Sequence, residues 1–134
     1  MLLPEYANAP GLVDRMAMRQ FSAGPGADFV QATAASAKRL ECMIVLAVLA
    51  QSESRWFNRS LVYDTNGELV FTYDKVHLTD TEQDELGLTE GTAPRVFEKA
   101  GVRMGFATCF DLYFPEYIGI TRHPRATFNR LLSG

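Results

Sequence analysis

The sequence has few of the features that would direct a chain to a membrane or to nucleic acid. Its longest apolar run, residues 43–50, is far shorter than the roughly 20 residues that a membrane-spanning helix needs. Its 13 Lys and Arg residues are scattered, and a net charge of −3 leaves no basic face for a phosphate backbone. We therefore expect neither a membrane nor a nucleic acid as a partner.

Cysteine is also scarce, since the chain has only Cys42 and Cys109. The two could form one disulfide in principle, but two cysteines in an acidic chain without a recognisable signal segment are typical of reduced thiols. We expect a cytoplasmic protein with two thiols, in which Cys42 fills the core. A chain of 134 residues with 47% hydrophobic composition is long enough for one domain with its own core.

The apolar pattern predicts an α/β fold. Helical spacing predicts helices near residues 12–20 and from Asp28 to Arg39, with Asp28 as the N-cap of the second. The short, continuous and partly β-branched run at residues 43–50 predicts a strand that is buried on both faces.

The second half of the chain contains further strand signals. Asn66-Gly67 between two β-rich runs predicts a hairpin with its tip at these residues, because both central positions of a type I′ turn need positive φ. An acid-rich loop follows, with a predicted helical turn near residues 81–85. A second strand pair is predicted at residues 95–98 and 102–108.

The strongest chemical signal is the stretch from Gly101 to Tyr117. Apolar residues lead to Cys109, and an Asp-Leu-Tyr-Phe-Pro-Glu segment that can open a helix follows. This is typical of a buried strand that presents a thiol at a strand-to-helix elbow, where a helix N-terminus lowers a thiol pKa and supplies N–H donors. The alternative is a core cysteine, because free cysteine is among the most buried residue types.

Two charged residues also stand at the ends of apolar runs. Glu5 follows Leu-Leu-Pro, and Lys75 lies in the segment Tyr-Asp-Lys-Val-His-Leu. Strand ends at one edge of an α/β sheet are where such folds build their sites. Taken singly, each residue also fits a solvated surface position, and His77 fits a structural role.

Three segments carry a resemblance to a known family. Residues 2–6, 73–78 and 105–116 resemble the three signature blocks of the nitrilase superfamily of carbon–nitrogen hydrolases, in that family's order. Residues 56–60, followed by the Asn-Gly hairpin, resemble its central strand pair. The resemblance implies a catalytic triad, with no cofactor and no metal, and its members are Glu5, Lys75 and Cys109.

The implied chemistry assigns a role to each residue. Cys109 attacks an amide carbon, and Glu5, a partly desolvated carboxylate with a raised pKa, is the general base. Lys75 and the backbone N–H of Phe110 stabilise the oxyanion, and water then hydrolyses the thioester. Asp111 is expected to hold the elbow or cap the helix that follows.

The resemblance also bears on a second acid and on the substrate. Many members of the family have a further acidic residue before the cysteine strand. The candidates here are Asp84 and Glu85, of which we favour Glu85, although the stretch also fits a solvated loop. The segment after Cys109 favours a small linear amide or an N-carbamoyl compound over a nitrile.

The family's fold is a four-layer α-β-β-α sandwich of about twice this length. We therefore expect residues 1–117 to form a truncated domain that lacks the first strand and helix and the C-terminal half. Residues 118–134 are expected to be an atypical tail, from a gene fragment or a frame shift. A sheet would then expose an apolar face, which favours a homo-oligomer or a complementing chain. The alternative function is a non-catalytic remnant that associates with a full-length homologue.

Overall fold

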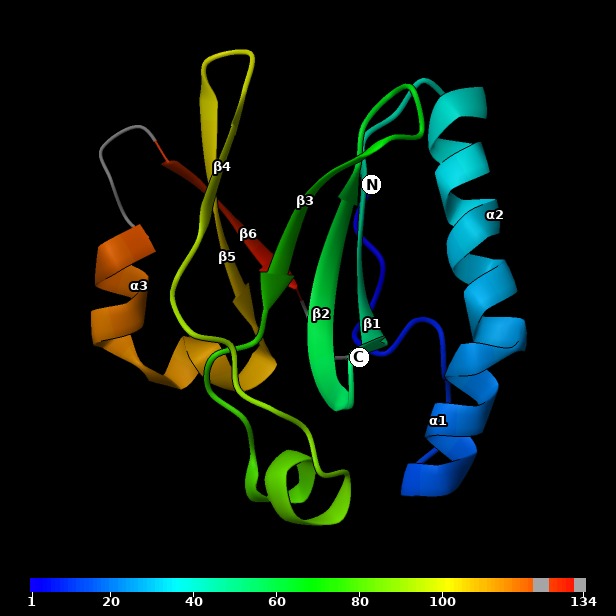
Figure 1. The fold of residues 1–134 in the computed structure, drawn as a ribbon. Helices are drawn as coiled ribbons and strands as arrows, with labels where there is room; N and C mark the ends of the chain where they lie inside the picture. Colours follow the sequence, from blue (N-terminus) through cyan, green and yellow to red (C-terminus); the bar gives the residue numbers. More distant parts are fainter. Residues whose placement is uncertain (122–125, 132–134) are drawn as a thin grey trace.

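Two three-stranded sheets lie between helices in the computed structural model of the protein (Figure 1). The structure describes residues 1–121 and 126–131, with side chains as far as residue 119. Helices α1 (Arg15–Ala23) and α2 (Pro25–Arg39) cover one sheet, and α3 (Pro115–Thr121) lies beyond the other (Figure 1). The expected α/β class and α-β-β-α arrangement are confirmed. In the described part of the chain, no helix is long and apolar enough to cross a membrane.

The second helix begins earlier than the sequence pattern suggested. Pro25 is the first residue of α2, where its missing N–H is not needed and its fixed φ suits a helix. Asp28 therefore lies in the first turn instead of at the N-cap, which is Gly24.

The first sheet is antiparallel, with the order β1-β2-β3. Its strands are β1 (Ile44–Ser52), β2 (Arg55–Tyr63) and β3 (Leu69–Asp74). The first six residues of β1 are all buried, as predicted for residues 43–50. Alternate side chains face opposite ways: Ile44 packs in the cluster under α2, whereas Val45 packs toward the second sheet.

The hairpin between β2 and β3 is confirmed, but its turn differs from the type I′ turn that Asn-Gly favours. Gly67 N–H donates to Asp64 O at 2.9 Å, and Asp64 Oδ1 accepts from the N–H groups of Asn66 and Glu68. Gly67 has a φ of 78°, whereas Asn66 does not have positive φ. The Asp64 side chain organises the backbone N–H groups, so the loop is a β-turn closed by a left-handed glycine.

The second sheet has the order β4-β5-β6. Strands β4 (Val96–Lys99) and β5 (Val102–Thr108) form the predicted antiparallel pair. Their two-residue turn has positive φ at both Ala100 (52°) and Gly101 (75°), which is the type I′ pattern. Strand β6 (Ala126–Leu131), within the stretch expected to be an atypical tail, pairs in parallel with β5.

The inner faces of the two sheets pack against each other. Val62 and Tyr73 of the first sheet share one apolar cluster with Met104 and Phe106 of the second. We expected a sheet of the truncated domain to expose its apolar face. For the described side chains that expectation is wrong, because each sheet covers the inner face of the other.

The N-terminal residues extend the first sheet along the free edge of β1. Leu2 forms a parallel bridge with Val45, and Ala7 N–H donates to Ala47 O at 2.9 Å. The Asn8 side chain continues this pairing, since its amide donates to Leu49 O at 2.9 Å and accepts from Leu49 N at 2.8 Å. This pairing fixes the segment that carries Glu5.

Candidate functional site

The structure brings together two of the residues that the sequence placed at strand ends. Glu5 lies on the segment beside β1, and Lys75 directly follows β3. Lys75 Nζ donates to Glu5 Oε1 at 3.1 Å. The Lys75 side chain is only 1% exposed, so a solvated surface position is excluded. Its charge must therefore be balanced within the protein.

A second carboxylate, Glu82, completes the balance. Lys75 Nζ donates to Glu82 Oε2 at 2.8 Å and to Oε1 at 3.0 Å. Glu82 is 4% exposed. The cation thus lies between two acidic side chains, one from the N-terminal segment and one from the acid-rich loop.

The identity of this second acid corrects our expectation of Glu85. Both residues belong to the π-helical turn Thr81–Glu85, but Glu82 points inward and Glu85 is exposed. The reason is a reciprocal pair of hydrogen bonds: Thr79 N–H donates to Glu82 Oε2 at 2.9 Å, and Glu82 N–H donates to Thr79 Oγ1 at 3.3 Å. This is the capping-box pattern, Thr-x-x-Glu, which is visible in the sequence and was the signal that could have identified Glu82.

Two further polar residues, which the sequence analysis missed, hold the carboxylates. Asn58 Nδ2, from β2, donates to Glu5 Oε1 at 2.6 Å and to Glu82 Oε1 at 2.9 Å. Tyr6 OH donates to Glu82 Oε1 at 2.5 Å. Asn58 is 1% exposed, and its Oδ1 has no hydrogen-bond partner among the described residues. The Asn58 NH₂ group therefore binds both carboxylates, while its carbonyl oxygen accepts no hydrogen bond from the described residues.

The charges of this cluster stabilise each other. Burial acts to lower the pKa of Lys75, but the carboxylates of Glu5 and Glu82 outweigh it and raise that pKa overall. Burial acts to raise the pKa of Glu82, but the hydrogen bonds from Lys75, Tyr6, Thr79 and Asn58 lower it overall. Lys75 and Glu82 are therefore both charged at neutral pH.

The lowered pKa of Glu82 predicts an acid-dependent stability. Because the folded state holds this carboxylate ionised, its contribution is fully present above the unfolded pKa of about 4.3 and is lost as the pH falls through the lower folded value. We expect Glu82→Gln to reduce the free energy of unfolding at pH 7, and the difference from the unaltered chain to shrink below about pH 4. Urea unfolding at several pH values measures this. The exposed Glu85→Gln is the control, and a difference that stays constant down to pH 3 would contradict the assignment.

Cys109 lies directly after β5, as the first residue of the 3-10 helix Cys109–Tyr113, with a φ of 47°. The predicted strand-to-helix elbow is thus present. Neither Cys109 nor Cys42 is in a disulfide. Cys42 is only half-buried, before β1, so it does not fill the core as expected.

Asp111 joins the two strand ends that carry Lys75 and Cys109. Its Oδ2 accepts from Thr108 N–H at 2.9 Å and from Tyr73 OH at 2.6 Å. Its Oδ1 accepts from His77 N–H at 2.8 Å and lies 3.0 Å from His77 Nδ1. Asp111 is fully buried and also forms a capping box with Thr108 at the start of the 3-10 helix. Its expected role of holding the elbow is borne out by these contacts.

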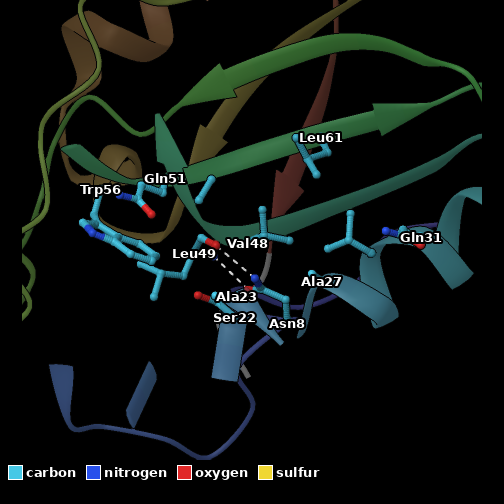
Figure 2. Close-up of a pocket in the computed structure, with 12 residues that line it drawn as sticks. Asn8, Ser22, Ala23, Ala27, Gln31, Val48, Leu49, Gln51, Trp56 and Leu61 are labelled. Carbon is cyan, nitrogen blue, oxygen red and sulfur yellow. Dashed lines mark hydrogen bonds between the residues drawn. The ribbon is translucent and has the colours of Figure 1, made fainter. Parts of the chain in front are cut away.

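A separate cavity of about 370 Å³ lies between the α1–α2 corner and strands β1 and β2 (Figure 2). Figure 2 shows Trp56, Val48, Leu61 and Ala27 along it, and the hydrogen-bonded Asn8 and Leu49 line it as well. None of the charged residues around Lys75 lines this cavity.

Comparisons with known proteins agree with this architecture. The sequence model of the carbon–nitrogen hydrolase family matches residues 1–128. The 2-oxoglutaramate amidase of Bacillus subtilis is 31% identical over 72 residues, which are 54% of this chain and 28% of that protein. The omega-amidase YafV of Escherichia coli is 34% identical over 90 residues, which are 67% of this chain and 35% of that protein.

A solved structure shares the fold. The NitFhit protein of C. elegans superposes with a TM-score of 0.81 at 21% identity, covering 96% of this chain and 35% of that one. The chain belongs to the carbon–nitrogen hydrolase family, within the nitrilase superfamily. It spans about a third of the length of the curated relatives that it matches.

Proposed function

We propose that this chain carries the catalytic residues of a thiol-dependent amidase, which hydrolyses a linear amide or an N-carbamoyl compound without a cofactor. The observation that carries the proposal is the buried Lys75 between Glu5 and Glu82, joined through Asp111 to the strand end that bears Cys109. The amidase relatives support hydrolysis of a small-molecule C–N bond.

In this proposal the general base is one oxygen of Glu5. Within the described residues, every hydrogen bond to this carboxylate goes to Oε1, from Asn58 and Lys75. Oε2 remains to take the proton of the Cys109 thiol. The thiolate then attacks the substrate carbonyl carbon, and a C–S bond forms as the carbonyl oxygen becomes an oxyanion.

Lys75 and the backbone N–H of Phe110 stabilise that oxyanion; removal of one such donor typically costs about 3–4 kcal/mol. As the C–N bond breaks, Glu5 gives its proton to the leaving ammonia or amine. A water molecule then attacks the thioester, with Glu5 again as the base, and the acid product and the thiol are released. Glu82 keeps Lys75 charged and in place throughout.

Ammonia release tests the proposal. We expect the protein to release ammonia from small linear ω-amides or N-carbamoyl amino acids faster than from a nitrile. Cys109→Ser should release none above background, because the hydroxyl is a far weaker nucleophile than a thiolate. Cys42→Ser is the matched control and should retain the rate. Equal turnover by Cys109→Ser and the unaltered chain would sink the mechanism.

The proposal includes a partner. We propose that the chain acts as a homo-oligomer or together with a complementing chain, which would contribute to the substrate pocket. Without turnover by the chain alone or as an oligomer, the alternative of a non-catalytic remnant holds. Light scattering of the assayed sample gives the oligomeric state.

A further inference from the structure

Two arginines of α1 bind the backbone of the loop that carries Glu82. Arg15 Nη2 donates to Asp84 O at 2.7 Å, and Arg15 Nε donates to Glu85 O at 2.5 Å. Arg19 Nη2 donates to Leu86 O at 2.9 Å and to Gly87 O at 3.2 Å. Four consecutive carbonyl groups are thus held by two side chains that lie about 70 positions away in the sequence.

The arrangement suits the chemistry of both partners. Arg15 and Arg19 are four residues apart and therefore project from the same face of α1. The carbonyls that they bind are at and just beyond the end of the turn Thr81–Glu85, where carbonyl groups lack partners within the helix and attract cations. A guanidinium suits this role because its donors form a rigid, planar fork.

The contact is close enough to restrict the loop. Gly87 has a φ of 64°, and a Cβ at this position would lie 3.1 Å from the Arg15 guanidinium carbon. Beneath the arginines, Met18 of α1 shares an apolar cluster with Leu86 and Leu88 of the loop. The Arg19 guanidinium also lies 5.0 Å above the ring of Trp56. The loop is therefore fixed on α1 by polar and apolar contacts together.

This attachment holds in place the arrangement that the Thr79 capping box sets, with Glu82 on Lys75. With the carbonyls of Asp84 and Glu85 held by Arg15, the Glu85 side chain is exposed and Glu82 is buried against Lys75. We propose that Arg15 and Arg19 are positioning residues that hold Glu82 on Lys75 and so fix the cation that the proposed mechanism directs at the reacting centre. The inference deepens the proposed function and rests on it, because Glu82 and Lys75 are its catalytic cluster.

The test uses the full chain and two measurements that need no substrate. The variants are Arg15→Met/Arg19→Met, which removes all four bonds, and Arg15→Lys/Arg19→Lys, which keeps the charges. The control is Arg95→Met, since Arg95 also lies over an aromatic ring, at 4.8 Å from Phe71, and donates to a carbonyl, Thr72 O. Hydrogen exchange reports the loop at residues 79–88. Iodoacetamide labelling across a pH series reports the Cys109 thiolate, with Cys42 as internal reference.

In the methionine variant we expect exchange of residues 79–88 to accelerate by about tenfold or more, while residues 44–63 keep their protection. The pH midpoint of Cys109 labelling should rise by about one unit, because the proposed mechanism uses the fixed Lys75 cation to favour the thiolate, and the variant no longer holds that cation in place. The lysine variant should show a smaller shift, and Arg95→Met none. If amides are hydrolysed, kcat should fall by about 10–100-fold with little change in KM.

Three results would overturn the inference: unchanged exchange in the methionine variant, faster exchange with an unchanged Cys109 midpoint, or equal effects in Arg95→Met. The lysine variant keeps the test informative if the methionine variant fails to fold, because an unshifted midpoint together with faster loop exchange would also count against it. Failure of the unaltered chain to hydrolyse any amide would instead overturn the proposed function, and it would leave both substrate-free measurements valid.

Discussion

Replacement of Lys75 by Met is expected to lower the free energy of unfolding by about 3–5 kcal/mol, because removal of one partner from a buried ionic cluster leaves its charges unpaired. Lys75 Nζ binds Glu5 Oε1 and both oxygens of Glu82. Without the cation, the two carboxylates share only the Asn58 amide between them. Under the proposed mechanism, catalysis should be lost as well, since the oxyanion loses a charged donor.

The loss in free energy of unfolding in Lys75→Met should also depend on pH. In Lys75→Met, Glu82 loses the hydrogen bond from Lys75 that lowers its pKa while the burial that raises its pKa remains, so the folded state binds a proton more readily than the unfolded state. Stability of the variant therefore falls as the pH rises. We expect the deficit relative to the unaltered chain to be larger at pH 7 than at pH 5, as measured by urea unfolding at both values.

Two further variants test whether unpaired buried charge causes the loss of stability in Lys75→Met. Lys99→Met breaks an ion pair of similar length, 3.0 Å to Asp64, but this lysine is 41% exposed, so a much smaller loss is expected. Lys75→Met/Glu82→Gln removes one of the two uncompensated charges and should recover part of the stability lost in the single variant. If the Lys75→Met protein is as stable as the Lys99→Met protein, Lys75 does not balance the charge of the buried carboxylates.

The parts of the site that follow from local sequence were predictable. A strand that ends in a charged or nucleophilic residue places that residue at the sheet edge, which is how Lys75 and Cys109 were found. Glu82 was missed because several carboxylates stand in one loop, and only the Thr79 capping box distinguishes it from Glu85. Asn58 was missed because an amide on a strand reads the same whether its face is buried or exposed.

The fold shows the same division between local and distant causes. The strand pairs were predicted, but the type I′ turn predicted at Asn66-Gly67 was wrong: the Asp64 side chain binds the backbone there, and the type I′ conformation occurs at Ala100-Gly101. The pairing of β6 with β5 is parallel and depends on the crossover through the 3-10 helix and α3, so no pattern within one strand specifies it. Sequence patterns describe single elements well, whereas their partners depend on the whole chain.

Removal of the Asp111 carboxylate is expected to be as damaging as loss of Lys75. In Asp111→Ala, the N–H groups of Thr108 and His77 and the hydroxyl of Tyr73 lose their acceptor inside a fully buried site. Each unsatisfied group costs about 1–3 kcal/mol, and the costs are not additive. We expect a loss of about 3–5 kcal/mol in the free energy of unfolding by urea denaturation.

The reactivity of Cys109, the proposed nucleophile, should respond separately from stability. Cys109 holds a positive φ, which a non-glycine residue keeps only where the surroundings enforce it. Asp111 fixes Thr108, the residue before Cys109. We therefore expect Asp111→Ala to bring the rate of Cys109 alkylation toward that of Cys42, under conditions where the variant and the unaltered chain are both folded. The ratio of the Cys109 and Cys42 alkylation rates reports the conformation of the strand-to-helix elbow.

Graded replacements decide whether hydrogen bonding at Asp111 is the cause. Asp111→Asn retains one acceptor oxygen and should lose less stability than Asp111→Ala. Asp74→Asn breaks the partly exposed pair with Arg59, 2.6 Å long, and should cost about 1 kcal/mol or less. If Asp111→Ala destabilises no more than Asp74→Asn, the buried acceptor does not hold the elbow. If stability falls but Cys109 keeps its reactivity, the conformation at Cys109 is set by the strand and the 3-10 helix alone.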